Sequence, residues 1–112
     1  MARKQINTNR KGSKFVDKVK KYLEERGYIV IKVSASKPFD LVMWDIGITK
    51  ATIFECRTSG GTSKAMSDLN SKSNGILADR VVALRKGKGI RFFEDYSFGI
   101  KERAFVDLGC RG

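Results

Sequence analysis

Two short stretches decide the fold of this chain: PFDLVMW at residues 38–44 and ATIFECR at residues 51–57. Both are rich in β-branched and aromatic residues, and a turn around Gly47 separates them, so they predict a β-hairpin. Alternate residues of a strand share one face. The hairpin therefore carries its polar residues in a predictable pattern, and the rest of the chain is interpreted around it.

Pairing of Asp45 with Lys50 across a four-residue loop would bring Asp40 opposite Glu55. Side chains that face each other across a ladder lie about 5 Å apart at Cβ, and like charges there repel. A cation is needed to keep both carboxylates. Arg57, two residues along on the face of Glu55, can supply it, and so can a bound divalent metal.

The composition is that of one soluble globular domain spanning residues 1–112. Hydrophobic residues make up 41% and charged residues 31% of the chain. No apolar run approaches the roughly 20 residues of a membrane span, and no signal-peptide pattern opens the chain, so we expect a cytoplasmic protein without membrane contact. The 23 Lys and Arg against 12 acids give a net charge of +11. Such an excess favours a polyanionic partner, above all nucleic acid, over a basic surface that serves solubility alone.

The chain has no histidine. This excludes His-based acid–base chemistry, Ser-His and Cys-His nucleophile pairs and most zinc sites. Any catalysis must rely on carboxylates, cations, hydroxyls and hard metals. Cys56 lies in an apolar strand pattern, which is typical of a buried, unreactive thiol, and Cys110 in the tail is interpreted as a bystander.

The first residues, 1–12, form a basic arm that we expect to be mobile and to grip phosphate. Ser13 is a candidate N-cap for a helix over residues 14–26, which Gly27 ends. The candidate DNA-binding residues of this region are Arg3, Lys4, Arg10, Lys11, Ser13 and Lys14.

Further elements alternate in type along the chain. The pattern predicts strands over residues 28–33, 80–84, 90–93 and 104–106, the first of them interior, and a helix that Thr62 or Ser63 caps and that ends near residues 74–75. A second basic cluster surrounds the turn at residues 86–89: Arg85, Lys86, Lys88 and Arg91. The order predicts an α/β (α+β) domain with a single central mixed β-sheet flanked by helices.

These residues resemble the PD-(D/E)XK nuclease superfamily and, within it, the archaeal Holliday junction resolvases and their viral and phage relatives. Pro38-Phe39-Asp40 resembles the first acidic motif with one residue inserted, and Glu55-Cys56-Arg57 resembles Glu-x-Lys with Arg in place of Lys. The opening of the first helix, RKGS at residues 10–13, is also similar. The resemblance covers roughly residues 10–93 and implies a restriction-endonuclease-like fold.

The resemblance implies phosphodiester hydrolysis with Mg²⁺ or Mn²⁺. Asp40, Glu55 and the Cys56 backbone carbonyl would be the metal ligands, Arg57 would stabilise the added negative charge, and Ser36 would orient the phosphate or the water. The expected protein is thus a metal-dependent, structure-selective DNA endonuclease of recombination and repair that resolves four-way junctions as a homodimer.

Two positions depart from the family pattern. Val16 stands where the first helix carries a glutamate in relatives, and the adjacent Asp17 is rotated away, so it is interpreted as a surface acid. Arg57 stays charged and cannot act as a base; Lys32 or Lys50 are candidates for the missing lysine's role. Two alternatives therefore remain, a non-catalytic basic DNA-binding protein and a related nuclease acting on flaps or duplex DNA.

The C-terminal third is rich in aromatic residues. They are interpreted either as core or as part of a dimer face, and they are Phe92, Phe93, Tyr96, Phe98 and Phe105.

Overall fold

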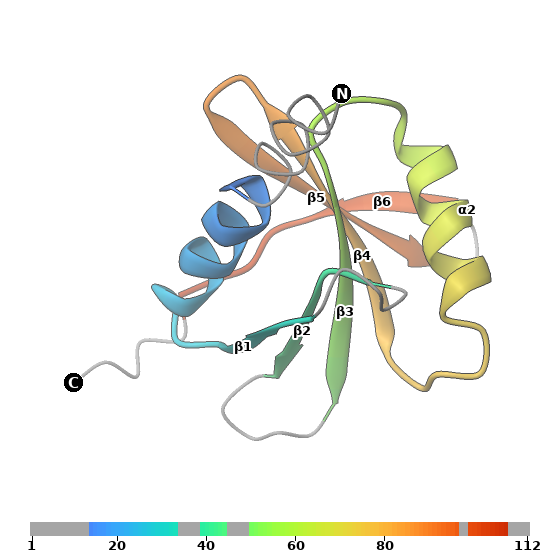
Figure 1. The fold of residues 1–112 in the computed structure, drawn as a ribbon, viewed down its shortest axis with the longest axis horizontal. Helices are drawn as coiled ribbons and strands as arrows, with labels where there is room; N and C mark the ends of the chain where they lie inside the picture. The colour runs from blue at the N-terminus through green and yellow to red at the C-terminus, as the bar shows by residue number, and fades with distance from the viewer. Residues whose placement is uncertain (1–13, 34–38, 45–49, 97–98, 108–112) are drawn as a thin grey trace, which may run out of the picture.

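The structure, a computed structural model, describes residues 14–33, 39–44, 50–96 and 99–107. These residues form a six-stranded sheet with a helix on each face (Figure 1). The predicted basic arm of residues 1–12, the Ser36 loop and the turn at Gly47 lie outside the described residues.

The sheet is mixed and its strands follow chain order, β1-β2-β3-β4-β5-β6. Only the β3–β4 pair is parallel, and α2 provides its crossover, while the other neighbouring strands are antiparallel. The predicted single mixed sheet flanked by helices is confirmed. The labelled elements are β1 Ile29–Lys32, β2 Leu41–Trp44, β3 Ala51–Arg57, α2 Thr62–Lys72, β4 Asp79–Lys86, β5 Gly89–Tyr96 and β6 Gly99–Arg103.

The first helix, described over residues 14–24, packs its apolar stripe on one face of the sheet. Its spacing of apolar residues is that of an amphipathic helix, as predicted. Gly27, with φ of 97°, ends the helix, and the Tyr28 N–H reaches back to the Leu23 carbonyl at 3.3 Å. This is the Schellman arrangement in which glycine is favoured. The buried partners in this core include Phe15, Val19, Leu23, Leu41, Phe54, Phe92 and Phe105.

On the opposite face, α2 covers β3 and β4. Ala65, Met66 and Leu69 of the helix pack against Ile53 and Val82 of the two strands. The N-cap is Gly61, which makes no side-chain cap, so the predicted capping by Thr62 or Ser63 is wrong. With the extended Gly61 as N-cap, the helix begins at Thr62, one residue earlier than a Thr62 cap and two residues earlier than a Ser63 cap would have placed it.

Two strand predictions need correction. The strand predicted as interior is β1, an edge strand, and Ile29 and Ile31 on one of its faces are 45% and 52% exposed. The last strand is β6 rather than residues 104–106. Phe105 follows that strand and is buried because it enters the core, where its ring centroid lies 4.8 Å from that of Phe92. For Phe105 the apolar pattern thus predicted burial correctly, but it did not predict that the residue is buried outside a strand.

The aromatic residues of the C-terminal third are accordingly divided. Phe92 and Phe105 are core residues, which excludes them from a dimer face. Phe93 is half-buried beneath the guanidinium of Arg91. The side chains of Tyr96 and Phe98 lie outside the described part. In that part, no helix is long and apolar enough to span a bilayer.

Candidate active site

The β2–β3 hairpin has the predicted register, with Trp44 paired to Ala51 and Leu41 to Phe54. The paired ladder ends at Leu41. The Asp40 N–H then donates to the Phe54 carbonyl at 2.8 Å instead of continuing the register to Glu55. Asp40 and Leu41 thus both lie opposite Phe54, and two residues opposite one define a β-bulge. Bulges redirect side chains, and here the Asp40 carboxylate turns to the backbone of the neighbouring strand.

Asp40 is anchored at the end of β2 by a backbone donor. Its Oδ2 accepts a hydrogen bond of 2.8 Å from the Cys56 N–H. Burial raises the pKa of this carboxyl above its usual range, while the Cys56 N–H and the charges of Arg57, Lys72 and Lys32 oppose the rise. A carboxylate whose ionised form is disfavoured in this way gains from an added cation.

Glu55 is buried on the α2 face of β3, and its cation is Arg57. The Arg57 Nε donates to Glu55 Oε2 at 2.7 Å, and Nη2 donates to Asp68 Oδ2 at 3.0 Å. Burial alone would lower the pKa of Arg57, but its hydrogen bonds and ion pairs with the two carboxylates raise it. Arg57 therefore remains a cation and bridges β3 to α2.

Asp68 is the residue of this cluster that the sequence prediction missed. It lies on α2 beside the buried stripe of Ala65 and Leu69 and is only half-buried. Its position three residues after Ala65 places it on the border of the sheet-facing stripe. That spacing was the available signal, although it identifies a border position without naming its partner.

The Cys56 thiol does not take part in this chemistry. Burial raises its pKa well above the usual value, and the nearby charges of Asp40 and Glu55 raise it further. A protonated thiol is a poor nucleophile. The residue contributes through its backbone and through its packing against the core beneath the first helix, as the strand pattern predicted.

The carboxylate oxygens that remain free suit a hard metal ion. Within the described residues, Asp40 Oδ1 and Glu55 Oε1 accept no hydrogen bond. The described residues contain no cluster of three acidic, histidine or cysteine ligands. A site with only two carboxylate ligands suits Mg²⁺, because this ion commonly binds through one or two carboxylates and completes its coordination shell with water and substrate phosphate.

The residues that depart from the family pattern have other partners. Val16 is buried in the core beneath the first helix. Asp17, mostly exposed, pairs with Lys32 at 2.8 Å, as expected of a surface acid. Lys50 pairs with Asp79 at the start of β3, five residues or about 16 Å of strand from Glu55, so it cannot supply the missing cation.

Of the predicted DNA-binding residues, Lys14 is exposed at the described start of the first helix. The others, like Ser36, lie outside the described part: Arg3, Lys4, Arg10, Lys11 and Ser13.

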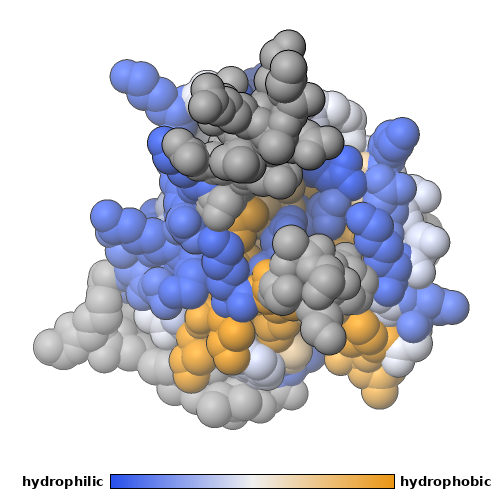
Figure 2. Space-filling model, in the orientation of Figure 1, coloured by the Kyte–Doolittle hydropathy of each residue, from blue (hydrophilic) through white to orange (hydrophobic). Residues whose placement is uncertain are grey.

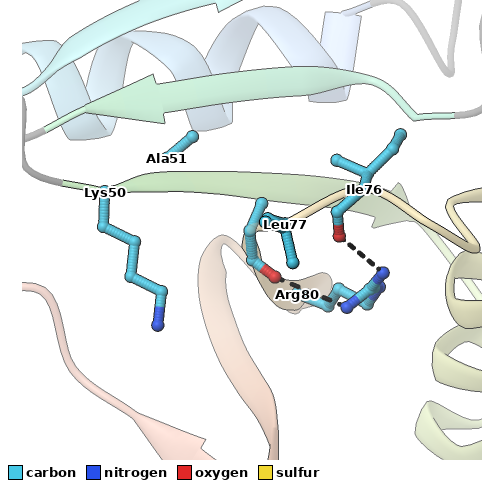
Figure 3. A pocket seen from close by; sticks show the side chains of 6 residues that line it. Lys50, Ala51, Ile76, Leu77 and Arg80 are labelled. Carbon is cyan, nitrogen blue, oxygen red and sulfur yellow. Dashed lines mark hydrogen bonds between the residues drawn. The ribbon is translucent and has the colours of Figure 1, made fainter.

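A hollow of about 470 Å³ lies at the other end of the sheet, between the start of β3 and the loop that precedes β4 (Figure 3). Lys50, Ala51 and Leu77 are among its lining residues. Arg80 holds the loop in place by donating to the carbonyls of Ile76, Ala78 and Ser73. Asp40, Glu55 and Arg57 are not among its lining residues.

A single mixed sheet with a helix on each face and two acidic residues near the β2–β3 hairpin is the arrangement that the resemblance found in the sequence led us to expect. Comparison with known structures agrees. The chain is similar to Hjc of Archaeoglobus fulgidus, a Holliday junction resolvase, with a TM-score of 0.59, 18% sequence identity and 83% of each chain covered. At this identity, the likeness establishes the fold.

Sequence comparison leads to the same group. A segment of 53 residues is 43% identical to the crossover junction endodeoxyribonuclease Hjc of Methanocaldococcus jannaschii. The match spans 47% of this chain and 38% of that protein, well under two thirds of the relative's length. No family model matches the chain. The predicted resemblance to the archaeal Holliday junction resolvases is thus confirmed in both sequence and fold.

Proposed function

We propose that this protein is a metal-dependent endonuclease that cleaves branched DNA, with the four-way junction as its substrate. One observation carries the proposal: Asp40, directly before β2, and Glu55 of β3 each keep a carboxylate oxygen that accepts no hydrogen bond from the described residues, and both lie near Arg57 in a resolvase-like fold. The net charge of +11 fits a polyanionic substrate.

Asp40 and Glu55 would hold Mg²⁺ or Mn²⁺, together with the Cys56 carbonyl. The bound ion would lower the pKa of its water and neutralise charge on the scissile phosphate. The Cys56 N–H keeps Asp40 in place through Oδ2, and Oδ1, which accepts no hydrogen bond from the residues that the structure describes, can bind the ion. Arg57, held by Asp68, keeps a permanent positive charge beside Glu55, where it can stabilise negative charge that develops on the phosphate. Ser36 is proposed to orient the phosphate or the water.

The substrate preference is the first prediction. With Mg²⁺ or Mn²⁺, we expect the protein to cleave a four-way junction at least about tenfold faster than a flap or a linear duplex of the same sequence, a difference of about 1.4 kcal/mol. Gel assays with labelled arms measure all three rates under identical conditions. Equal rates would contradict junction selectivity and favour a nuclease for flaps or duplex. Binding without cleavage in either metal would leave the non-catalytic DNA-binding protein.

A four-way junction has near two-fold symmetry, so two cuts require two sites related by a two-fold axis. We propose that the protein acts as a homodimer and that the β1 edge of the sheet provides the interface. Ile29 and Ile31 are the exposed apolar residues of this edge, and α2 does not extend over it. Figure 2 shows apolar surface over β1 and β2. Because the substrate is nearly two-fold symmetric, we propose that a second copy of this chain covers the β1 edge.

The dimer prediction uses a matched pair of substitutions. Ile31→Lys places a charge in the proposed interface and should convert the dimer to a monomer, measured by light scattering after size exclusion. Leu77→Lys, at a residue that is 98% exposed, makes a similar change outside that edge and should leave the mass unchanged. A monomeric wild type, or a dimer that survives Ile31→Lys, would contradict the assignment.

A further inference from the structure

A second hollow, of about 310 Å³, lies between the first helix and the β4–β5 hairpin. Lys18 joins the two elements, because its ammonium donates to the carbonyl of Lys88 in the hairpin turn. The hollow is therefore bounded by two elements that are tied together. Its lining residues are Lys14, Phe15, Lys18, Arg85, Gly87 and Lys88. We call its four cations, Lys14, Lys18, Arg85 and Lys88, the basic cradle.

The basic cradle has no acid to balance its charge. Within the described chain, none of its four cations forms an ion pair, and no acidic residue lines the hollow. Arg91 of the predicted second basic cluster differs, because it is paired with Glu102 at 2.6 Å. Neighbouring like charges repel. A group of unpaired cations around a hollow is therefore stabilised by a bound anion.

The basic cradle and the acidic pair lie at the same end of the sheet. Arg57 of β3 pairs with Leu84 of β4, and Arg85 is the next residue along β4. The two sites lie on opposite faces of the sheet. Arg85 is two residues after Ala83 and therefore shares the face that the first helix covers, whereas Glu55 lies on the face that α2 covers. DNA that crosses this end of the sheet can reach both sites.

We propose that the basic cradle binds backbone phosphates of a duplex DNA arm, away from the scissile phosphate. This inference rests on the proposed function for the identity of the polymer. Each strand of DNA presents a charge about every 3.4 Å along the helix axis, so a single arm can place several phosphates against four cations. In Figure 2 the visible surface over the first helix is predominantly hydrophilic, as such a contact requires.

The basic cradle should govern affinity and its salt dependence rather than the rate of hydrolysis. Contacts to phosphate fix the position of the duplex without reading its sequence. Each phosphate contact that is lost weakens binding of all sequences alike and lowers the slope of log K against log salt by about one. Losing a cradle contact leaves Asp40, Glu55 and Arg57 in place, so the rate of hydrolysis of bound DNA should not change.

The test compares two neighbours on β4. Arg85→Glu reverses a charge in the cradle. Lys86→Glu makes the same charge reversal at a residue on the other strand face that is also exposed and that forms no ion pair with another described residue. Binding of labelled duplex and junction is measured by fluorescence anisotropy in EDTA, between 50 and 200 mM salt. We expect Arg85→Glu to weaken binding of both DNAs about tenfold or more and to reduce the salt slope by about one, and Lys86→Glu to change affinity by less than about threefold.

Equal losses for the two variants would overturn the proposal, because net charge alone would then explain binding. Unchanged affinity of Arg85→Glu would overturn it as well. The milder Lys88→Gln guards against a folding defect and should reduce the salt slope in the same direction. Competition by millimolar inorganic phosphate without any effect of the substitutions on DNA would reveal a small-anion site instead.

The outcome is separable from that of the proposed function. If the wild type cleaves junctions and Arg85→Glu binds DNA normally, the cradle is wrong and the nuclease stands. If no DNA is cleaved and Arg85→Glu still loses affinity, the cradle stands without the nuclease.

Discussion

Asp40→Asn should abolish DNA cleavage and at the same time raise the melting temperature at pH 7. Burial raises the pKa of the Asp40 carboxyl, so ionising it costs folding free energy. The protonated form contributes stability that is fully present below the unfolded pKa near 3.8 and is lost as the pH rises through the higher folded value. An asparagine keeps an oxygen that can accept from the Cys56 N–H but has no charge to desolvate.

Thermal unfolding of both proteins from pH 3.5 to 7.5, without metal, measures this effect. The melting temperature of Asp40→Asn should exceed that of the wild type at pH 7, and the gap should close as the pH falls towards 4. Added Mg²⁺ should stabilise the wild type more than the variant, because only the wild type has both carboxylates. A variant less stable than the wild type at pH 7 would contradict the view that Asp40 is held in a strained ionised state.

Arg57→Met should cause the largest loss of stability at the site. Glu55 is 7% exposed, and Arg57 is its cation. Removing the guanidinium leaves a buried carboxylate without its hydrogen bonds, at a cost of about 2 kcal/mol. For a domain of this size, that corresponds to a fall of roughly 10 °C in melting temperature.

Matched variants separate this effect from the loss of any ion pair. Lys20→Met removes the exposed Lys20–Glu24 pair and should cost no more than about 0.5 kcal/mol. The double variant Glu55→Gln with Arg57→Met should recover much of the lost stability, since no buried charge then remains. If the double variant is no more stable than Arg57→Met alone, the loss arises from packing and the ion-pair account is wrong.

Arg57→Lys adds a functional control, because it restores the lysine of the Glu-x-Lys pattern. A lysine keeps the charge near Glu55 but lacks the planar fork that allows Arg57 to contact Asp68 as well.

The hairpin shows how much of the molecule was predictable. The assumed pairing of Asp45 with Lys50 across a four-residue loop led to the register of Trp44 with Ala51 that the structure has. The bulge at Asp40 was not predictable, since it depends on the hydrogen bond to the Phe54 carbonyl that forms only in the folded sheet. Local pattern thus located the acidic pair, while tertiary hydrogen bonds determined where Asp40 points.

Long-range partners account for the other differences. The pairing of Arg57 with Asp68 joins residues eleven positions apart on a strand and a helix, and no local spacing rule connects them. The edge position of β1 followed from the order of all six strands. Its apolar residues, Ile29 and Ile31, indicated burial, and in the proposed dimer that burial is provided by a second copy.

The time course of four-way junction cleavage in Mg²⁺ by the wild type, Asp40→Asn and Glu55→Gln is the most direct test of the proposed active site. We expect the wild type to cut the junction and both folded variants to be slower by at least about 100-fold, because each carboxylate would hold the metal ion that stabilises transition-state charge. Cleavage by either variant at the wild-type rate would contradict the assignment of Asp40 and Glu55 as the residues that hold the catalytic metal.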